Sequence, residues 1–375
     1  MKTAPRIGGL KPSPVRMMME GAPADASPLG LGEPSWELPQ VARKALAVAG
    51  EGVCGYGPNN GLAELRAAIG RRYGAGPDDV LVAAGSQASL FALYHAYLGP
   101  GDVVLIPDPY FPAYAALAQL AGASVALYAT SPERGFRPDA ASFLAALEAH
   151  PGARVAVVGA PGNPTGGGID AEDLRRIAAA CHERDVLLVS DEVYRELWFG
   201  SPCVGLRDVA RTGVVISSMS KGFGAPGLRV GWISGDAALL APARTIHSYM
   251  CTSAALTSQR AAIALLDAAD DVAAAARREM ATRWEAFSST AAECWGVRPR
   301  RPDGAFYWWS ALPPHAGTDD LAFALRLRDE AHVVTTPGFA FGPSGKGRLR
   351  ISFAAAPERV AEGVRRMTRL WTGKA

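Results

Sequence analysis

The chain has 375 residues, of which 49% are hydrophobic and 20% charged, the composition of a globular protein of about two domains. Its formal net charge of +2 gives no reason to expect a nucleic-acid partner, and its apolar stretches are shorter than the roughly 18 residues that a membrane span needs. The five cysteines include no CxxC pair, which favours reduced thiols in a cytoplasmic protein over disulfides or a metal site; they are Cys54, Cys181, Cys203, Cys251 and Cys294.

The N-terminal part of the chain contains few regular patterns. Residues 1–26 are rich in Pro and Met and are expected to form an irregular arm over another surface or a disordered tail. They lack a continuous apolar run, so secretion is not expected. A turn-rich segment, Leu29–Pro34, leads into a predicted helix over Pro39–Val48, and a second helix follows Gly61.

From Asp79 onward, short apolar runs alternate with amphipathic segments. The predicted strands are Val80–Ala83, Val103–Ile106, Ser124–Tyr128, Val155–Val158, Val186–Val189, Val214–Ser217 and Arg229–Ile233. Predicted helices between them include Gln87–Tyr97, Pro112–Leu120, Ala140–His150 and Ala171–His182. This alternation predicts an α/β fold, with a mostly parallel sheet covered by helices on both faces. Ligands of such sheets bind outside the carboxyl ends of the strands.

After Ser234 the pattern is helical, and the last third of the chain mixes strands with helices. Helices are expected over Ala237–Tyr249, Ser253–Ala268 and Val272–Cys294. Beyond them, the predicted strands are Phe306–Ser310, Val333–Thr336 and Leu349–Phe353, and the predicted helices are Leu321–Ala331 and Glu358–Trp371. This pattern predicts a smaller α+β unit.

A lysine lies in a loop of small residues between two apolar strands. Lys221 follows Ser218 and Ser220, and Arg229 comes eight positions later. Burying an ammonium group costs several kcal/mol, roughly, unless a partner or a covalent bond removes its charge. The layout suits a lysine that forms an imine with an aldehyde whose phosphate is held by the serines and the arginine. The alternative is a surface loop with a solvated lysine and a structural arginine.

Two further segments follow strands and could contact a ligand. Gly85, Ser86 and Gln87 open a helix, whose free N–H groups could bind a phosphate, although Ser86 could be a plain N-cap. No GxGxxG follows the first strand, which argues against a dinucleotide-binding site. In the segment Tyr110–Phe111, an aromatic ring could stack on a flat cofactor or pack in the core.

Other polar residues also follow or lie in strands. Asn163 belongs to a turn sequence, Asn-Pro-Thr-Gly. Asp191 ends a buried strand, where a carboxylate needs a partner such as a protonated pyridine nitrogen, unless it is an ordinary N-cap. Arg348 and Arg350 share one face of a predicted strand, where a guanidinium could bind a carboxylate or remain solvated.

These motifs occur together and in order, and from about Leu29 to about Arg369 the sequence resembles the class I/II aminotransferases, pyridoxal-phosphate-dependent enzymes of fold type I. Gly304–Tyr307 and Pro337–Gly338 resemble two further signatures of that family. The resemblance implies that pyridoxal 5'-phosphate is the cofactor, that Lys221 binds it covalently and that Asp191 pairs with its ring nitrogen.

The resemblance also implies roles for the remaining candidates. Asn163 and Tyr194 would bond the phenolic oxygen of the cofactor, and Phe111 rather than Tyr110 would stack on its ring. Arg350 would bind the substrate carboxylate. The remaining implied contacts are Gly32 in a substrate-contacting turn, Asn163 beside the substrate, and Tyr56 at the cofactor phosphate of a neighbouring subunit.

The implied protein is a homodimer that moves an amino group between an L-amino acid and a 2-oxo acid by a ping-pong mechanism. Its expected divisions are 1–45 (the N-terminal arm and part of the small domain), 46–270 (the large cofactor-binding domain) and 271–375 (the C-terminal small domain). Relatives that prefer dicarboxylates often have a lysine at the position of Gln87, so its absence favours a neutral or aromatic amino acid, with 2-oxoglutarate still possible as the other substrate.

Two alternatives remain. A carbon–sulfur β-lyase of the same fold is excluded by no motif. A pyridoxal-phosphate-binding transcription regulator would need a DNA-binding module, which about 26 irregular N-terminal residues cannot supply.

Overall fold

The computed structural model describes residues 4–10, 12–51 and 55–374, and its centre is a seven-stranded sheet. Cys54 lies outside these ranges. The strands of the sheet are β2 (Val80–Ala83), β3 (Val103–Asp108), β4 (Ser124–Ala129), β5 (Ala153–Gly159), β6 (Leu187–Asp191), β7 (Val214–Ser218) and β8 (Gly231–Ser234). Their spatial order is β2-β8-β7-β6-β5-β3-β4, and β8 runs in the direction opposite to the other six strands. The predicted mostly parallel α/β sheet is therefore confirmed.

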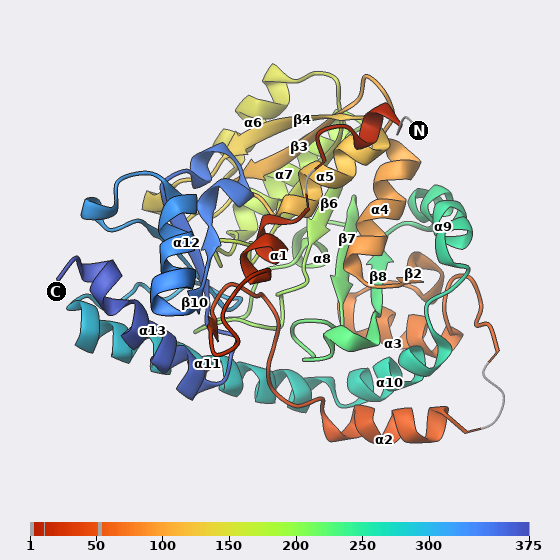
Figure 1. Cartoon of the computed structure of the whole chain (residues 1–375). Coiled ribbons are helices and arrows are strands. Elements are labelled where there is room, and N and C mark those ends of the chain that lie inside the picture. Colours follow the sequence, from red (N-terminus) through yellow and green to blue (C-terminus); the bar gives the residue numbers. More distant parts are fainter. Residues whose placement is uncertain (1–3, 11, 52–54, 375) are drawn as a thin grey trace.

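Helices cover both faces of this sheet (Figure 1). They are α3 (Ala63–Tyr73), α4 (Ser86–Tyr97), α5 (Pro112–Ala121), α6 (Ala140–Ala149), α7 (Ala171–Glu183), α8 (Leu206–Val209), α9 (Ala237–Cys251) and α10 (Leu256–Asp267). Alternate strand residues point to opposite faces. Val104 and Ile106 pack with α4, α5 and α9, whereas Leu105 between them packs with α6 and α7. Because both faces are covered, the central strands are apolar along nearly their whole length.

A second core lies beside the sheet and joins the two ends of the chain. Its elements are α1 (Pro14–Met19), β1 (Ser27–Pro28), α11 (Ala269–Trp295), β9 (Tyr307–Ala311), α12 (Asp320–Ala331), β10 (Val333–Val334), β11 (Thr336–Pro337), β12 (Arg348–Ser352) and α13 (Pro357–Thr372). Strands β11, β12 and β9 form an antiparallel sheet, and β1 pairs with β10. Met18 and Leu29 are buried in the same hydrophobic cluster as residues of α11 and α13. The predicted boundaries at 45/46 and 270/271 stay a prediction.

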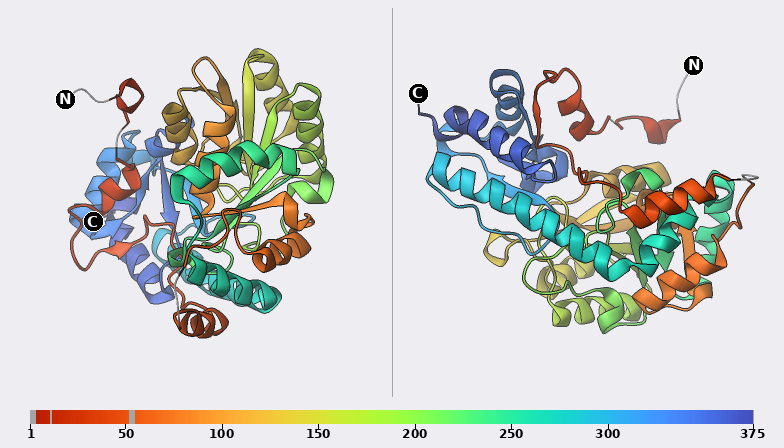
Figure 2. Two further views of the ribbon diagram at one scale, coloured as in Figure 1. Left: turned by 90° about the vertical axis from the view of Figure 1, so that its right-hand side faces the viewer. Right: turned by 90° about the horizontal axis from the view of Figure 1, so that it is seen from below.

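Long helices connect the two parts. Helix α2 (Gln40–Ala49) packs against α10, and α11 runs from beside the large sheet to α13 (Figure 2). Val360, Val364 and Met367 of α13 are buried at helical spacing, which turns one face of that helix towards the small core. None of the described helices is long and apolar enough to cross a membrane. Within the described part of the chain, the other four cysteines form no disulfide.

Three sequence-based expectations need correction. Arg229 does not lie in a strand: it has a left-handed backbone (φ 52°) after a short turn, and β8 begins only at Gly231. The predicted strand Val333–Thr336 is two strands, β10 and β11, which pair in different sheets. The arm before residue 27 is not irregular throughout, because Pro14 begins the short helix α1.

Candidate active site

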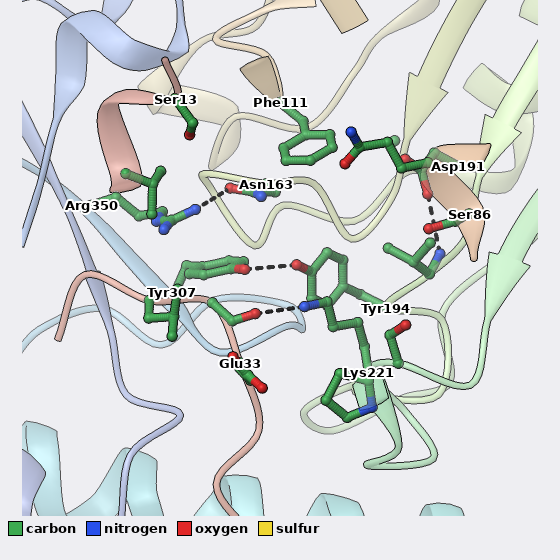
Figure 3. Close-up of a pocket in the computed structure, with 18 of the residues that line it drawn as sticks. Ser13, Glu33, Ser86, Phe111, Asn163, Asp191, Tyr194, Lys221, Tyr307 and Arg350 are labelled. Atoms are coloured by element: carbon green, nitrogen blue, oxygen red, sulfur yellow. Dashed lines mark hydrogen bonds between the residues drawn. The ribbon is translucent and has the colours of Figure 1, made fainter. Parts of the chain in front are cut away.

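The carboxyl edge of the large sheet forms one wall of a cavity of about 610 Å³. Side chains from the ends of β2, β3, β5, β6 and β7 reach it, and residues of α1, β9 and β12 close it from the other side. Figure 3 shows Asn163, Tyr194, Lys221 and Arg350 around the same space. The predicted site residues that line the cavity are Gly32, Ser86, Gln87, Phe111, Asn163, Asp191, Tyr194, Ser220, Lys221, Arg229 and Arg350.

Lys221 lies in the loop after β7, with its ammonium group directed towards the N-terminal segment. Its Nζ donates to the carbonyl oxygen of Gly32 at 2.5 Å, and a Cβ added at Gly32 would overlap the hydroxyl of Tyr307. Burial lowers the pKa of Lys221 to about 8, and the nearby charge of Arg350 acts in the same direction. The amine is therefore partly neutral, and nucleophilic, near neutral pH.

Asp191 is the last residue of β6 and is 8% exposed. Its Oδ2 accepts the hydroxyl of Tyr114 at 2.6 Å, and its Oδ1 accepts the N–H of Val193 at 3.3 Å. Burial raises the pKa of Asp191 to about 6, although both hydrogen bonds oppose that shift. No cationic side chain among the described residues pairs with Asp191, so a protonated ring nitrogen would be a favourable partner for it.

Arg350 lies in the middle of β12 and is 3% exposed. Its Nη1 donates to Oδ1 of Asn163 at 2.8 Å, and its Nη2 donates to the carbonyl oxygen of Gly30 at 2.6 Å. Its guanidinium carbon lies 4.4 Å from the centre of the Tyr307 ring. Its Nε is buried and has no hydrogen-bond partner in the described part of the protein. The guanidinium lines the cavity, where its planar set of donors suits a ligand such as a carboxylate.

Asn163 and Tyr194 lie beside Arg350 at the centre of the cavity. The hydroxyls of Tyr194 and Tyr307 are 2.7 Å apart (Figure 3). Burial, and then the neighbouring Tyr307, hold the pKa of Tyr194 well above its ordinary value, so the phenol stays protonated and can donate. Phe111 precedes α5 and points into the cavity, as the stacking hypothesis requires.

The N-terminus of α4 and Arg229 form a cradle at the cavity wall. Ser86 is the first residue of α4, and the free backbone N–H groups in the first turn of this helix favour binding of an anion there. Gly85 before it has a φ of 97°, and a Cβ at that position would overlap the guanidinium of Arg229. The absence of a side chain at Gly85 thus makes room for Arg229, which together with Ser220 could bind a phosphate.

Three predicted residues do not line this cavity. Gly85 packs against the guanidinium of Arg229 and does not reach the cavity. Ser218 is buried, and its Oγ accepts a hydrogen bond from the backbone N–H of Ser220 at 3.3 Å. Tyr56 is 91% exposed, so within one chain it reaches no site. The roles assigned to these residues stay predictions.

The structure adds lining residues that the sequence did not single out as site residues. They are Ser13, Val15, Arg16, Leu31, Glu33, Tyr114, Gly159, Pro161, Val193, Pro226, Gly227 and Tyr307. Pro14 followed by Val and Arg is a helix-start signal that could have marked α1. Tyr114 carries no such signal, because a tyrosine on an apolar helix face is indistinguishable from a core residue in sequence.

This arrangement fits pyridoxal 5'-phosphate. The N-terminus of α4 and Arg229 would hold its phosphate, Asp191 would pair with its ring nitrogen, and the amine of Lys221, which lines the same cavity, would react with its aldehyde. The guanidinium of Arg350 lines the same cavity and could bind the carboxylate of a second ligand.

Comparisons with known proteins agree with this assignment. The family described as "Aminotransferase class I and II" matches residues 25–367. The chain is 31% identical to an arginine–pyruvate transaminase of Pseudomonas aeruginosa, over 90% of this chain and 88% of the relative. It is also 31% identical to an aspartate/prephenate aminotransferase of Thermus thermophilus, over 92% of this chain and 91% of the relative.

A solved structure of aspartate aminotransferase from Thermus thermophilus with maleate superimposes with a TM-score of 0.90 at 29% identity, covering 99% of this chain and 100% of that one. The sequence match, the fold and the cavity lead to one conclusion. The chain belongs to the class I and II aminotransferases, a family of pyridoxal-phosphate-dependent transferases with fold type I.

Proposed function

We propose that this aminotransferase moves an amino group from an L-amino acid to a 2-oxo acid in two half-reactions that share one site. The observation that carries the proposal is the placement of Lys221 and Arg350 in one cavity. Lys221 supplies an amine whose pKa is lowered to about 8, and Arg350 supplies a guanidinium that lines the same cavity. A base and a carboxylate anchor at one site are what proton transfer at the Cα of an amino acid requires.

Lys221 and Arg350 have different roles towards the substrate: Arg350 binds it, and Lys221 transfers its proton. When bound, pyridoxal 5'-phosphate supplies an aldehyde for amino groups and a ring that takes up the electron pair left at Cα. Arg350 binds the substrate carboxylate and fixes the orientation of Cα. Nζ of Lys221 removes the proton from Cα and delivers a proton on the cofactor side, acting first as general base and then as general acid.

Three residues would control the protonation and hydrogen bonding of the bound cofactor: Asp191, Asn163 and Tyr194. The carboxylate of Asp191 would pair with the ring nitrogen of the bound cofactor and favour its protonated form. Oδ1 of Asn163 already accepts from Arg350, which leaves Nδ2 to donate to the phenolic oxygen of the cofactor. The protonated phenol of Tyr194 can donate to the same oxygen.

The amino-acid substrate is proposed to be neutral or aromatic. Gln87 lines the cavity, where a lysine would favour a dicarboxylate, and 2-oxoglutarate remains the candidate for the second substrate. One relative is named an arginine–pyruvate transaminase and another an aspartate/prephenate aminotransferase. Membership of the family therefore does not identify the substrate of this protein.

The active unit is proposed to be a homodimer with shared sites. Tyr56 is 91% exposed and Tyr249 is 90% exposed, an unusual state for large aromatic side chains. A second copy of the chain could cover both and bring Tyr56 to the phosphate cradle of the partner. Such an interface would be symmetric.

A reduction experiment tests the proposed chemistry. Treatment of the pyridoxal-phosphate-loaded protein with borohydride should attach the pyridoxyl group to Lys221, as peptide mass spectrometry would show. A spectral scan against a panel of amino acids should then show conversion of the cofactor to its amino form. Attachment to another lysine would contradict the proposal. Release of pyruvate and ammonia from a cysteine conjugate without an added oxo acid would instead support the β-lyase.

A further inference from the structure

We propose that Tyr114 is a positioning residue for Asp191, whose carboxylate it orients and keeps ionised, a proposal that rests on the role proposed above for Asp191. The hydroxyl of Tyr114 is 2.6 Å from Oδ2 of Asp191. Tyr114 is 4% exposed and Asp191 8%, so the hydrogen bond is largely shielded from bulk water, although both residues line the cavity. Hydrogen bonds to a charged acceptor are stronger than neutral ones, and more so when buried.

The fold brings these two residues together from distant parts of the sequence. Tyr114 lies in the first turn of α5, three residues after Phe111, and Asp191 ends β6. Gly159, the last residue of β5, pairs in register with Asp191. A Cβ at Gly159 would lie 3.0 Å from the Tyr114 hydroxyl, so the glycine leaves that hydroxyl space to reach the carboxylate.

The hydrogen bond opposes the effect of burial on the carboxyl group. Burial raises the pKa of Asp191 to about 6, and the Tyr114 donor is the largest influence that lowers it. The other groups facing Asp191 are Glu192, Tyr94 and Tyr194, none of which is cationic. Without Tyr114, the carboxyl group would hold its proton to higher pH, and a neutral carboxyl group cannot pair with a protonated ring nitrogen.

A purely structural role for Tyr114 predicts different behaviour, and Tyr94 provides the matched control. Tyr94 belongs to the same hydrophobic cluster as Tyr114 and is fully buried. Its hydroxyl has no hydrogen-bond partner among the described residues. Replacing either tyrosine with phenylalanine removes one buried hydroxyl, but only Tyr114→Phe removes a donor from Asp191.

The test is a spectral titration of cofactor-free protein with pyridoxal 5'-phosphate between pH 6 and 9. For Tyr114→Phe we expect the Kd to rise about 10-fold or more over wild type at pH 6 and the difference to shrink above pH 8, where Asp191 is ionised in both proteins. Tyr94→Phe should bind like wild type at every pH. A change in Kd that is independent of pH, or equal in the two variants, would overturn the proposal.

A double-variant cycle separates this proposal from the proposed function. The effect of Tyr114→Phe on Kd should disappear in an Asp191→Asn background, because no carboxylate remains to be kept ionised. An equal effect in both backgrounds would overturn the role of Tyr114 alone. If Asp191→Asn changes neither the Kd nor the half-reaction rate, the role of Asp191 in the proposed function fails and this proposal fails with it.

Discussion

Arg350 and Asn163 are joined by a hydrogen bond of 2.8 Å that connects the small sheet to the large one. Arg350 comes from β12, and Asn163 from the turn after β5. The bond uses the carbonyl oxygen of the Asn163 amide and one arm of the guanidinium. It leaves the amide nitrogen of Asn163 to donate to a ligand. The proposed carboxylate anchor, Arg350, and the proposed donor to the phenolic oxygen, Asn163, therefore orient one another.

Arg350→Lys should lower kcat/KM for the amino acid by roughly 10- to 150-fold, because a lysine cannot reach both Asn163 and a carboxylate with the geometry of a guanidinium. Single-turnover measurements of the amino-acid half-reaction would give this value. Arg348→Lys is the matched control: Arg348 lies two residues earlier on the same strand, stacked on Phe136 outside the cavity. Equal losses in the two variants would contradict a carboxylate-binding role for Arg350.

Asp191→Asn should still bind the cofactor, with a higher Kd, and should slow the amino-acid half-reaction by about 100-fold or more. A neutral amide cannot keep the ring nitrogen protonated, and the charge matters most when the electron pair at Cα is delocalised. Stopped-flow absorbance of the loaded variant measures this rate. A rate near that of wild type would exclude the proposed role.

The same variant should stabilise the cofactor-free protein at neutral pH. The pKa of Asp191 is 3.8 in the unfolded chain and about 6 when folded, so the folded state binds more protons between these values. The free energy of unfolding therefore falls as pH rises from about 4 to about 6. At pH 7–8, Asp191→Asn should remove a penalty of up to about 3 kcal/mol and raise Tm by a few degrees. The two Tm values should converge near pH 4, and a constant difference across pH would point to another cause.

Uptake of pyridoxal 5'-phosphate by the cofactor-free protein should accelerate with pH, with a midpoint near pH 8. Only the neutral amine of Lys221 is nucleophilic, and burial lowers its pKa from 10.5 to about 8. Stopped-flow absorbance between pH 6.5 and 10 measures the uptake rate. A midpoint near 10 would show that Lys221 is solvated in the cofactor-free protein.

Tyr56→Phe should weaken pyridoxal-phosphate binding by roughly 10- to 150-fold, the effect of one hydrogen bond to a charged group. The Tm of the cofactor-free protein should not change, because the substitution removes only a hydroxyl that has no role in the core of the chain. A sharper measurement mixes two inactive variants, Tyr56→Ala and Lys221→Ala. A hybrid dimer contains one site with both residues intact, so activity should return after subunit exchange. No recovery in demonstrated hybrids, or a fully active monomer in sedimentation, would show that Tyr56 does not act across an interface.

The sequence by itself determined the central sheet and the positions of most candidate site residues. Val80–Ala83 was predicted as a strand and is one, because a strand buried on both faces is apolar over its whole length. Asn163, Asp191 and Lys221 were predicted to lie near one another, because each follows or ends a strand, and the carboxyl ends of parallel strands share an edge.

Only the tertiary structure decided which distant groups meet at that edge. Tyr114 and Asp191 are 77 residues apart in sequence, and Gly32 and Lys221 are 189 residues apart. Local periodicity encodes which face of an element is buried, but it contains no information on which side chain lies opposite. The left-handed backbone of Arg229 likewise depends on its surroundings, because φ > 0 is unfavourable for arginine unless the surrounding structure holds it.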